Sequence, residues 1–103
     1  SSKVYEKDLV RIACDACNKL GADEVIVRAN PKDLRLLQKY RDEIAGKVGK
    51  RISFGDPIET VGGVRVSTSD GKIEVDDTLE GRMKRNFEDL RTKVAKILFE
   101  GLR

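Results

Sequence analysis

The two cysteines of this 103-residue chain form one of the few groupings whose spacing could support chemistry. Cys14 and Cys17 form C-x-x-C, the spacing used by dithiol oxidoreductases and by half of a zinc site. The chain has no other cysteine and no histidine, so a zinc site would lack its second pair of ligands. We interpret both as reduced residues of a helix, with Cys17 on its apolar side. A dithiol-dependent enzyme stays an alternative.

Gly46-Lys47-Val48-Gly49, followed by Lys50 and Arg51, matches the G-x-x-G loop with which KH domains hold a nucleic-acid backbone. In that fold the loop joins two helices, whereas here a strand pattern begins at Arg51. A loosened helix end is the better interpretation. A small KH-like RNA-binding domain using the Gly46–Gly49 loop stays the alternative function.

Acidic residues gather at Glu74, Asp76 and Asp77, a grouping that could bind a divalent cation. They lack the spacing of an EF-hand loop, so we interpret Asp76 as a cross-strand partner and Asp77 or Thr78 as a helix cap. The absence of histidine also removes the usual general base near neutral pH. The sequence therefore predicts no catalytic residue, no metal site and no cofactor, and we expect the chain not to be an enzyme.

Composition limits the chain to one domain with a modest core. Charged residues make up 38% of the chain and aromatic residues 5%, so Val, Ile and Leu must form most of that core. The 21 basic and 18 acidic residues give a net charge of +3 but are interspersed, unlike the one-sided basicity of a nucleic-acid-binding protein. No apolar run reaches the length of about 18 residues that a transmembrane helix needs. We therefore predict neither nucleic-acid binding nor direct membrane insertion.

Hydrophobic periodicity predicts helix, strand, helix and strand in the first half of the chain. Residues 4–20 repeat apolar side chains every three or four positions, and residues 24–29 form a β-branched run typical of a central strand. Asn30-Pro31 supplies a cap and a first-turn proline for one helix. Its apolar stripe is Leu34, Leu37, Tyr40, Ile44 and Val48. Residues 51–55 alternate as a second strand, which the intervening helix would place parallel to the first.

The second half is predicted to be a β-hairpin that leads into a long helix. A two-residue type I′ turn at Asp70-Gly71 makes Val66 face Val75 and Arg65 face Asp76. The hairpin then has an apolar face of Val64, Val66, Ile73 and Val75, and Glu80 can complete a capping box. The last helix has an apolar side of Leu79, Met83, Phe87, Leu90, Val94, Ile97 and Leu98. The prediction is an α+β fold, a mixed four-stranded sheet flanked by three helices, in the order helix-strand-helix-strand-hairpin-helix.

The hairpin and last helix resemble a known family. The stretch Gly62-Gly63-Val64-Arg65-Val66, the segment SDGKIEVD at 69–76, and Thr78-Leu79-Glu80 before an Arg-rich helix are similar to the C-terminal domain of the E subunit of archaeal A-type and related vacuolar-type ATP synthases. The resemblance extends over nearly the whole chain. It implies a non-catalytic peripheral-stalk subunit, a stator that anchors the catalytic head against rotor torque so that ATP synthesis or hydrolysis is coupled to proton transport.

This resemblance also implies partners and a location. The partners would be a companion coiled-coil stalk subunit of the G/H type and head subunits A and B, at the cytoplasmic face of the cell membrane. Residues 1–20 would be the end of a longer N-terminal helix packed on the domain, and residues 21–103 the globular head-docking part of one domain overall. The two terminal helices would pack together. Partner contacts are expected at Leu9, Ile12, Arg82, Arg85, Phe87 and Arg91, and a homodimer of the isolated fragment through its first helix stays open.

Overall fold

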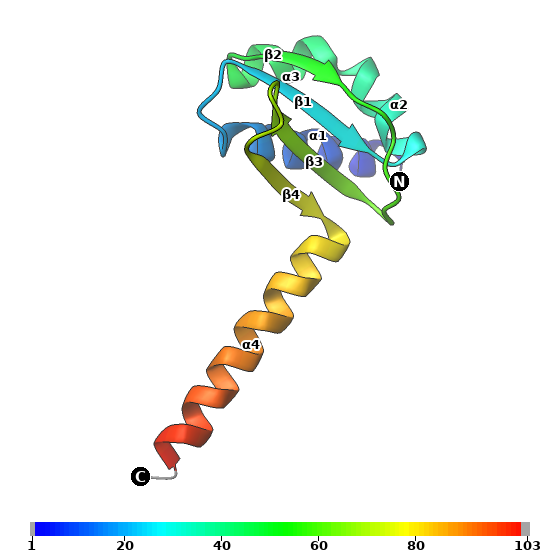
Figure 1. Cartoon of the computed structure of the whole chain (residues 1–103). Helices are drawn as coiled ribbons and strands as arrows, with labels where there is room; N and C mark the ends of the chain where they lie inside the picture. Colours follow the sequence, from blue (N-terminus) through cyan, green and yellow to red (C-terminus); the bar gives the residue numbers. More distant parts are fainter. Residues whose placement is uncertain (1, 102–103) are drawn as a thin grey trace.

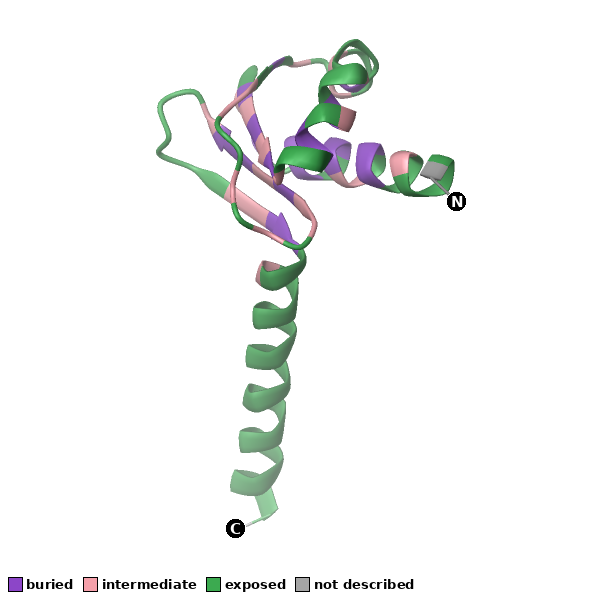
Figure 2. Ribbon diagram, turned by 90° about the vertical axis from the view of Figure 1, so that its right-hand side faces the viewer, coloured by how far each residue is buried: buried purple, intermediate pink, exposed green. Residues whose placement is uncertain are grey.

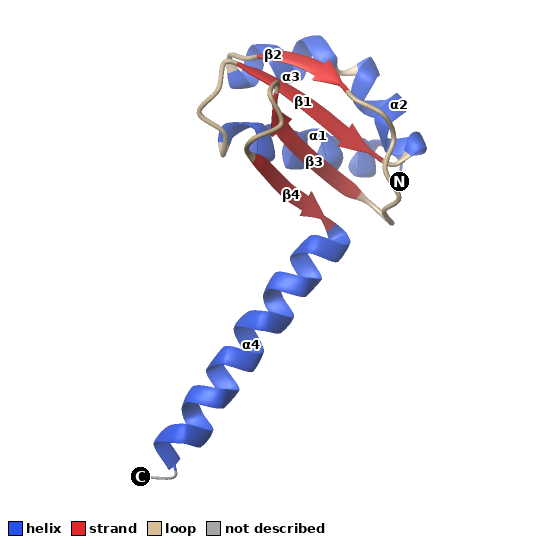
Figure 3. Cartoon of the chain, in the orientation of Figure 1, coloured by secondary structure: helices blue, strands red, loops and turns tan. Residues whose placement is uncertain are grey.

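A computed structural model describes residues 2–101. The elements are α1 (Ser2–Asn18), β1 (Glu24–Ala29), α2 (Pro31–Lys39), α3 (Arg41–Val48), β2 (Arg51–Phe54), β3 (Gly63–Thr68), β4 (Glu74–Thr78) and α4 (Leu79–Gly101). One sheet contains the strands in the order β2-β1-β3-β4 (Figure 3). β1 and β2 are parallel, and the other neighbours are antiparallel. The predicted α+β fold, the mixed sheet and the interior position of β1 are confirmed.

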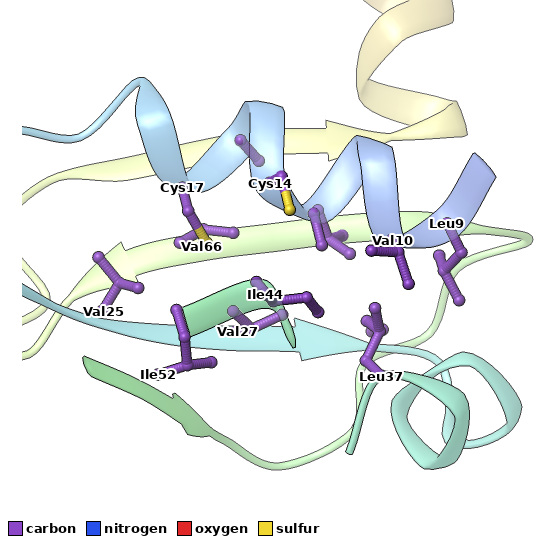
Figure 4. Close-up of a cluster of buried hydrophobic side chains, with 14 of the residues drawn as sticks. Leu9, Val10, Cys14, Cys17, Val25, Val27, Leu37, Ile44, Ile52 and Val66 are labelled. Carbon is purple, nitrogen blue, oxygen red and sulfur yellow. The ribbon is translucent and has the colours of Figure 1, made fainter. Parts of the chain in front are cut away.

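The core lies on one face of the sheet, between the strands and the helices α1, α2 and α3. Alternate residues of the inner strands point toward these helices, because side chains along a strand alternate between its two faces. Val25 and Val27 of β1 and Val64 and Val66 of β3 are buried there. Side chains of α1 meet them from one side, and Leu37 and Ile44 of α2 and α3 close the cluster (Figure 4). Within residues 2–101, no helix covers the opposite face of the sheet (Figure 1).

The predicted second helix is two helices, α2 and α3, separated at Tyr40. That residue leaves helical geometry (φ −105°, ψ 15°), and its hydroxyl donates to Glu6 Oε2 of α1 at 2.9 Å. Asp42 and Glu43 then occupy the first turn of α3, where the helix dipole favours acidic side chains. The prediction of one helix is therefore wrong, although its stripe does pack in or against the core as expected.

The hairpin register is confirmed, but the predicted turn type is wrong. Arg65 pairs with Asp76, and Val66 pairs with Val75. A type I′ turn needs positive φ at both central residues, and only Gly71 has it, at 75°. The Asp70 carboxylate instead accepts bonds from the Thr68 hydroxyl (2.6 Å) and the Lys72 N–H (3.0 Å), which closes a longer loop. Ile73 lies at the end of that loop, 59% exposed, so its assignment to the apolar face is also wrong.

Helix α4 extends away from the rest of the chain (Figures 1 and 2). It follows β4 without a connecting loop, and none of its described residues is buried. In this structure the first and last helices therefore do not share a core, and the prediction that they pack together is wrong. Because no loop turns the chain back at the end of β4, the helix continues outward from the sheet.

Candidate functional site

Most of the exposed large apolar side chains among the described residues lie on α4. Met83, Phe87, Leu90, Val94 and Ile97 follow one another at alternating spacings of four and three residues. They are 46% to 67% exposed. Such spacing places side chains in one seam along a helix, the arrangement that a second helix covers in a coiled coil. We call these five residues the α4 seam, and they make α4 a candidate protein-binding surface.

The start of α4 is fixed by a cap that the sequence supplies. The Thr78 hydroxyl accepts the N–H of Gly81 at 3.1 Å, which satisfies one of the free donors of the first turn. The carboxylate of Asp76 in turn accepts the Thr78 N–H at 3.0 Å. Gly81 lies against that carboxylate, because a Cβ at Gly81 would be 2.8 Å from Asp76 Oδ1. This close approach explains a glycine in the first turns of the helix.

A buried carboxylate at Asp77 joins three elements. Asp77 is 3% exposed and pairs with Val64 across the hairpin, which turns its side chain toward the covered face of the sheet. Lys19, just after α1, lies 3.0 Å from Asp77 Oδ2, and Arg85 of α4 lies 3.2 Å from Oδ1. Arg85 also donates to the backbone carbonyl of Asp76 at 2.7 Å. These bonds tie the second turn of α4 to β4 and to the end of α1.

Glu80 fixes α4 from a second direction. Its carboxylate accepts the Val61 N–H at 2.8 Å and a bond from the Thr60 hydroxyl. Both bonds hold the pKa of Glu80 below its usual value, and the bond from the Thr60 hydroxyl has the larger effect. Asn30, which caps α2, donates to the carbonyls of Thr60 and Val61. The loop before β3 is thus bonded to both α2 and α4, and the predicted capping-box role of Glu80 is replaced by this contact.

Tyr5 and Asp33 connect α1 to α2. Asp33 is fully buried in the first turn of α2, and one of its carboxylate oxygens accepts a bond from the Tyr5 hydroxyl. Burial, together with this carboxylate, raises the pKa of Tyr5 to about 12. The Tyr40–Glu6 bond and the Lys39–Glu6 ion pair, at 3.9 Å, add further polar attachments between α1 and the helices beside it.

A groove of about 540 Å³ runs between α1 and α3. Val10 and Cys14 contribute apolar surface to it, and charged side chains of both helices form its rim. The lining residues are Lys3, Glu6, Lys7, Val10, Arg11, Cys14, Tyr40, Glu43 and Lys47. Cys14 is the one thiol among these lining residues, and the sequence holds no histidine that could serve as its base.

Both cysteines are reduced and buried in α1, as the sequence predicts. Burial raises the pKa of Cys17 to about 11, and burial also raises the pKa of Cys14. A reactive or redox-active thiol has a lowered pKa. The geometry therefore does not support the alternative of a dithiol-dependent enzyme.

Comparison with known proteins matches this architecture to one family. The family model of the ATP synthase (E/31 kDa) subunit matches residues 1–99. The chain belongs to this family. It is 39% identical over 95 residues to the A-type ATP synthase E subunit of Thermococcus gammatolerans, covering 92% of this chain and 48% of that protein. It is 38% identical over 99 residues to the same subunit of Methanopyrus kandleri, covering 96% of this chain and 50% of that protein.

A third relative agrees with these two. The A-type ATP synthase E subunit of Thermococcus kodakarensis is 40% identical over 101 residues, covering 92% of this chain and 50% of that protein. The chain thus spans about half the length of the curated relatives it matches. All three relatives are archaeal A-type subunits, as the resemblance in the hairpin and last helix predicts.

The residues predicted to touch a partner fall into two groups. On α4 of this member of the E-subunit family, Phe87 is part of the α4 seam and 63% exposed. Arg82 and Arg91 are exposed beside the seam, whereas Arg85 is held by Asp77 and Asp76. On α1, Leu9 is 3% exposed within the core and Ile12 is partly buried against it. The structure brings the α4 residues together on one helix and leaves Leu9 almost no surface to offer; the partner contacts themselves stay predictions.

Sequence reasoning misses the contacts that orient α4. It interprets Asp77 or Thr78 as the helix cap, and Thr78 is the cap. Continued by one residue, the predicted register pairs Asp77 with Val64 and so points it toward the apolar face. That signal identifies Asp77 as a buried charge that needs cationic partners. Lys19 lies 58 residues away along the chain, and no pattern in the sequence indicates it.

The G-x-x-G segment is the end of a helix. Gly46 lies inside α3, and Gly49 is its C-cap in the left-handed conformation with φ 66°. β2 begins at Arg51. A KH loop between two helices is therefore not formed, and the predicted loosened helix end is confirmed. Among residues 2–101, no group of three or more Cys, Asp or Glu side chains is arranged to hold a metal ion.

Proposed function

We propose that this chain is the globular part of a peripheral-stalk subunit, a stator of a rotary A-type ATP synthase. It contributes no catalytic group of its own. Its role is to anchor the catalytic head against the torque of the rotor, so that proton transport stays coupled to ATP synthesis or hydrolysis. The observation that carries this proposal is membership of the E-subunit family over residues 1–99.

The contacts at the base of α4 support a load-bearing role. A stator must pass force between a long element and a rigid body without bending at the junction. The junction here has no loop, and Asp77, Glu80 and Arg85 bond the first two turns of α4 to β4, to Lys19 and to the loop before β3. Force on α4 would therefore enter the four-stranded sheet directly.

The assembly context is part of the same proposal. The partners are a companion coiled-coil stalk subunit of the G/H type and head subunits A and B, and the location is the cytoplasmic face of the cell membrane. Across the described residues, none of the helices combines the length and the apolar character that a bilayer crossing needs. Residues 1–20 belong to a longer helix in this proposal, and residues 21–103 dock on the head.

Co-purification tests the assignment. We expect the tagged full-length protein, expressed with the head subunits and the companion stalk subunit, to co-purify with the head and with the companion subunit. If the full-length protein joins neither, the stator assignment is wrong. The variant Arg82→Glu with Arg91→Glu is expected to weaken recovery of a partner, because both arginines border the α4 seam. Arg35→Glu with Arg41→Glu, which makes the same charge change on α2 and α3, is the matched control.

A further inference from the structure

Two arginines lie side by side on the face of the sheet that no helix of residues 2–101 covers, which we call the open face (Figure 1). Arg28 of β1 pairs directly with Arg65 of β3 in the antiparallel register. Val27 and Ala29 are buried on the covered face, so Arg28 between them projects from the open face. Like charges at directly opposite positions of a sheet are unfavourable. Both arginines therefore need a negative charge nearby.

Only Arg65 receives that compensation within the described part of the chain. Glu74 Oε1 of the edge strand β4 lies 3.3 Å from Arg65 Nε, and Asp76 Oδ2 lies 3.7 Å from Arg65 Nη2. Arg28 is one strand farther from β4 and makes no ion pair with any of the described residues. The open face therefore holds one guanidinium group without a carboxylate partner.

The strand register explains why Arg28 has no acidic neighbour. On its β2 side lies Gly55, where a Cβ would be 2.6 Å from Arg28 Nε. The two diagonal positions are Ser53 of β2 and Ser67 of β3, which both pair with Ile26. Arg28 Nη1 donates to Ser67 Oγ at 3.3 Å, its one hydrogen bond among the described residues. Small neutral groups thus hold the half-buried guanidinium in place and leave room for another molecule to reach it.

The charges around Arg28 favour a single carboxylate over an extended polyanion. Glu74 and Asp76 lie on the same face, two strands away, which is about 10 Å. A nucleic acid or an anionic membrane that covered Arg28 would also meet these carboxylates and be repelled. One acidic side chain directed at Arg28 avoids that repulsion.

The size of the open face disfavours a second copy of the chain held by this face alone. Its four strands contain four to six residues each. With strands about 4.8 Å apart and a rise of about 3.3 Å per residue, the face covers roughly 300 Å². Each partner of a stable complex buries about 800 Å². The open face therefore suits one contact of a partner that other contacts already hold nearby.

We propose that the open face is a second docking surface, separate from α4, at which Arg28 receives an aspartate or glutamate side chain of another subunit of the same assembly. A guanidinium binds a carboxylate through two parallel N–H donors, which fixes the direction of approach as well as adding binding energy. The inference rests on the proposed function in one respect, since the assembly supplies the contacts that keep this partner near.

A zero-length cross-link tests this contact in the full-length protein, expressed with the head subunits and the companion stalk subunit. Arg28→Lys keeps the positive charge and supplies an amine, which a carbodiimide joins only to a carboxylate that touches it. We expect mass spectrometry to find position 28 linked to an aspartate or glutamate of another subunit. Arg35→Lys, the same change at an exposed position of α2, is the matched control and should give no such link at position 35.

The outcomes separate this inference from the stator assignment. If the wild-type protein joins the other subunits but position 28 links to none of them, the open-face contact is wrong and the stator assignment stands. Links from position 28 only to Glu74 or Asp76, or only to a second copy of the chain, also overturn the contact. If the wild-type protein joins no other subunit, both proposals fail.

Removing the charge gives a second, independent measurement. We expect Arg28→Gln to weaken the affinity of the full-length protein for the rest of the assembly about tenfold, and Arg35→Gln to leave it unchanged. Because Arg28 makes no ion pair within the described chain, the thermal midpoint of Arg28→Gln should stay within about 4 °C of the wild type. Equal affinities of the two variants would overturn the inference. A larger fall in the midpoint would mean that Arg28 also supports the fold, and the cross-link at position 28 then decides.

Discussion

At the scale of single residues, Asp77 holds a negative charge on the covered face of the sheet, and Lys19 and Arg85 neutralise it. Removing the carboxylate leaves these two cations without their partner, so we expect Asp77→Ala to lower the free energy of unfolding by about 2 to 3 kcal/mol. This is below the usual range for a fully buried pair, because both cations are about half exposed. Denaturant titration measures the change. Asp89→Ala, at an exposed position of α4, is the control and should stay within about 0.5 kcal/mol; equal effects of the two variants would contradict the role of Asp77.

The raised pKa of Cys17 predicts a loss of stability at alkaline pH. The thiol ionises at 9.0 in the reference state and at about 11 in the folded chain. A group with a raised folded pKa stabilises the fold below its unfolded pKa and loses this contribution as pH rises through the folded pKa. We expect the free energy of unfolding to fall by about 2 kcal/mol from this group between those values, and the Tyr5 hydroxyl to extend the fall toward its pKa of about 12. Denaturant titrations across this range should show a shallower fall for Cys17→Ala, and equal slopes for both proteins would refute the assignment.

At the scale of elements, two glycines give opposite predictions. Gly63 opens β3 with φ 90°, and a Cβ there would lie 2.5 Å from the backbone oxygen of Asp77. Gly63→Ala must therefore move the β3–β4 ladder, and we expect a loss of about 2 to 4 kcal/mol. Gly46→Ala, in α3 with open space around it, should instead stabilise by about 0.5 to 1 kcal/mol. Thermal and denaturant unfolding of both variants measures the difference, and a tolerated alanine at Gly63 would mean that the hairpin is looser in solution than its ladder implies.

The elements that the sequence predicts well are those that local pattern determines. The register of the hairpin follows from alternation, since a one-residue slip would expose Val64 and Val66. The helix break at Tyr40 and the turn at Asp70 depend instead on side-chain bonds to Glu6, Thr68 and Lys72. Hydrophobic periodicity carries no information about those bonds. Sequence patterns therefore predict the helix without its break and give the turn the wrong type.

The candidate site is predictable in the same uneven way. The apolar stripe of α4 is plain in the sequence, and so are the exposed arginines beside it. An amphipathic stripe normally faces the core of its own domain, which is why the sequence predicts that the first and last helices pack together. Whether a stripe is covered by its own chain or left open is decided by the geometry of the β4–α4 junction, a tertiary property.

At the scale of the whole molecule, the chain consists of a compact part and an extended helix. Its radius of gyration is 16.5 Å with extents of 56 × 34 × 23 Å, whereas a compact chain of this length has a radius of gyration of about 13 Å. The buried hydrophobic residues all precede α4, in the segment from Leu9 to Val66. Folding free energy therefore resides in the compact part, and the contacts that hold α4 to it are those at its base.

This division predicts the behaviour of a shortened chain. A chain ending after Asn86 keeps Glu80 and Arg85, and with them the bonds at the base of α4, while the described residues that it loses are all exposed. We expect its midpoint of thermal unfolding to stay within about 4 °C of the full chain, and its radius of gyration in X-ray scattering to fall toward about 13 Å. In the full chain alone, amides beyond Asn86 should exchange rapidly, because an isolated stretch of helix this short is marginal in water. A larger fall in the midpoint, or slow exchange along all of α4 without a partner, would mean that the helix folds back on the sheet in solution, and the exposed α4 seam would then no longer be available for a second helix.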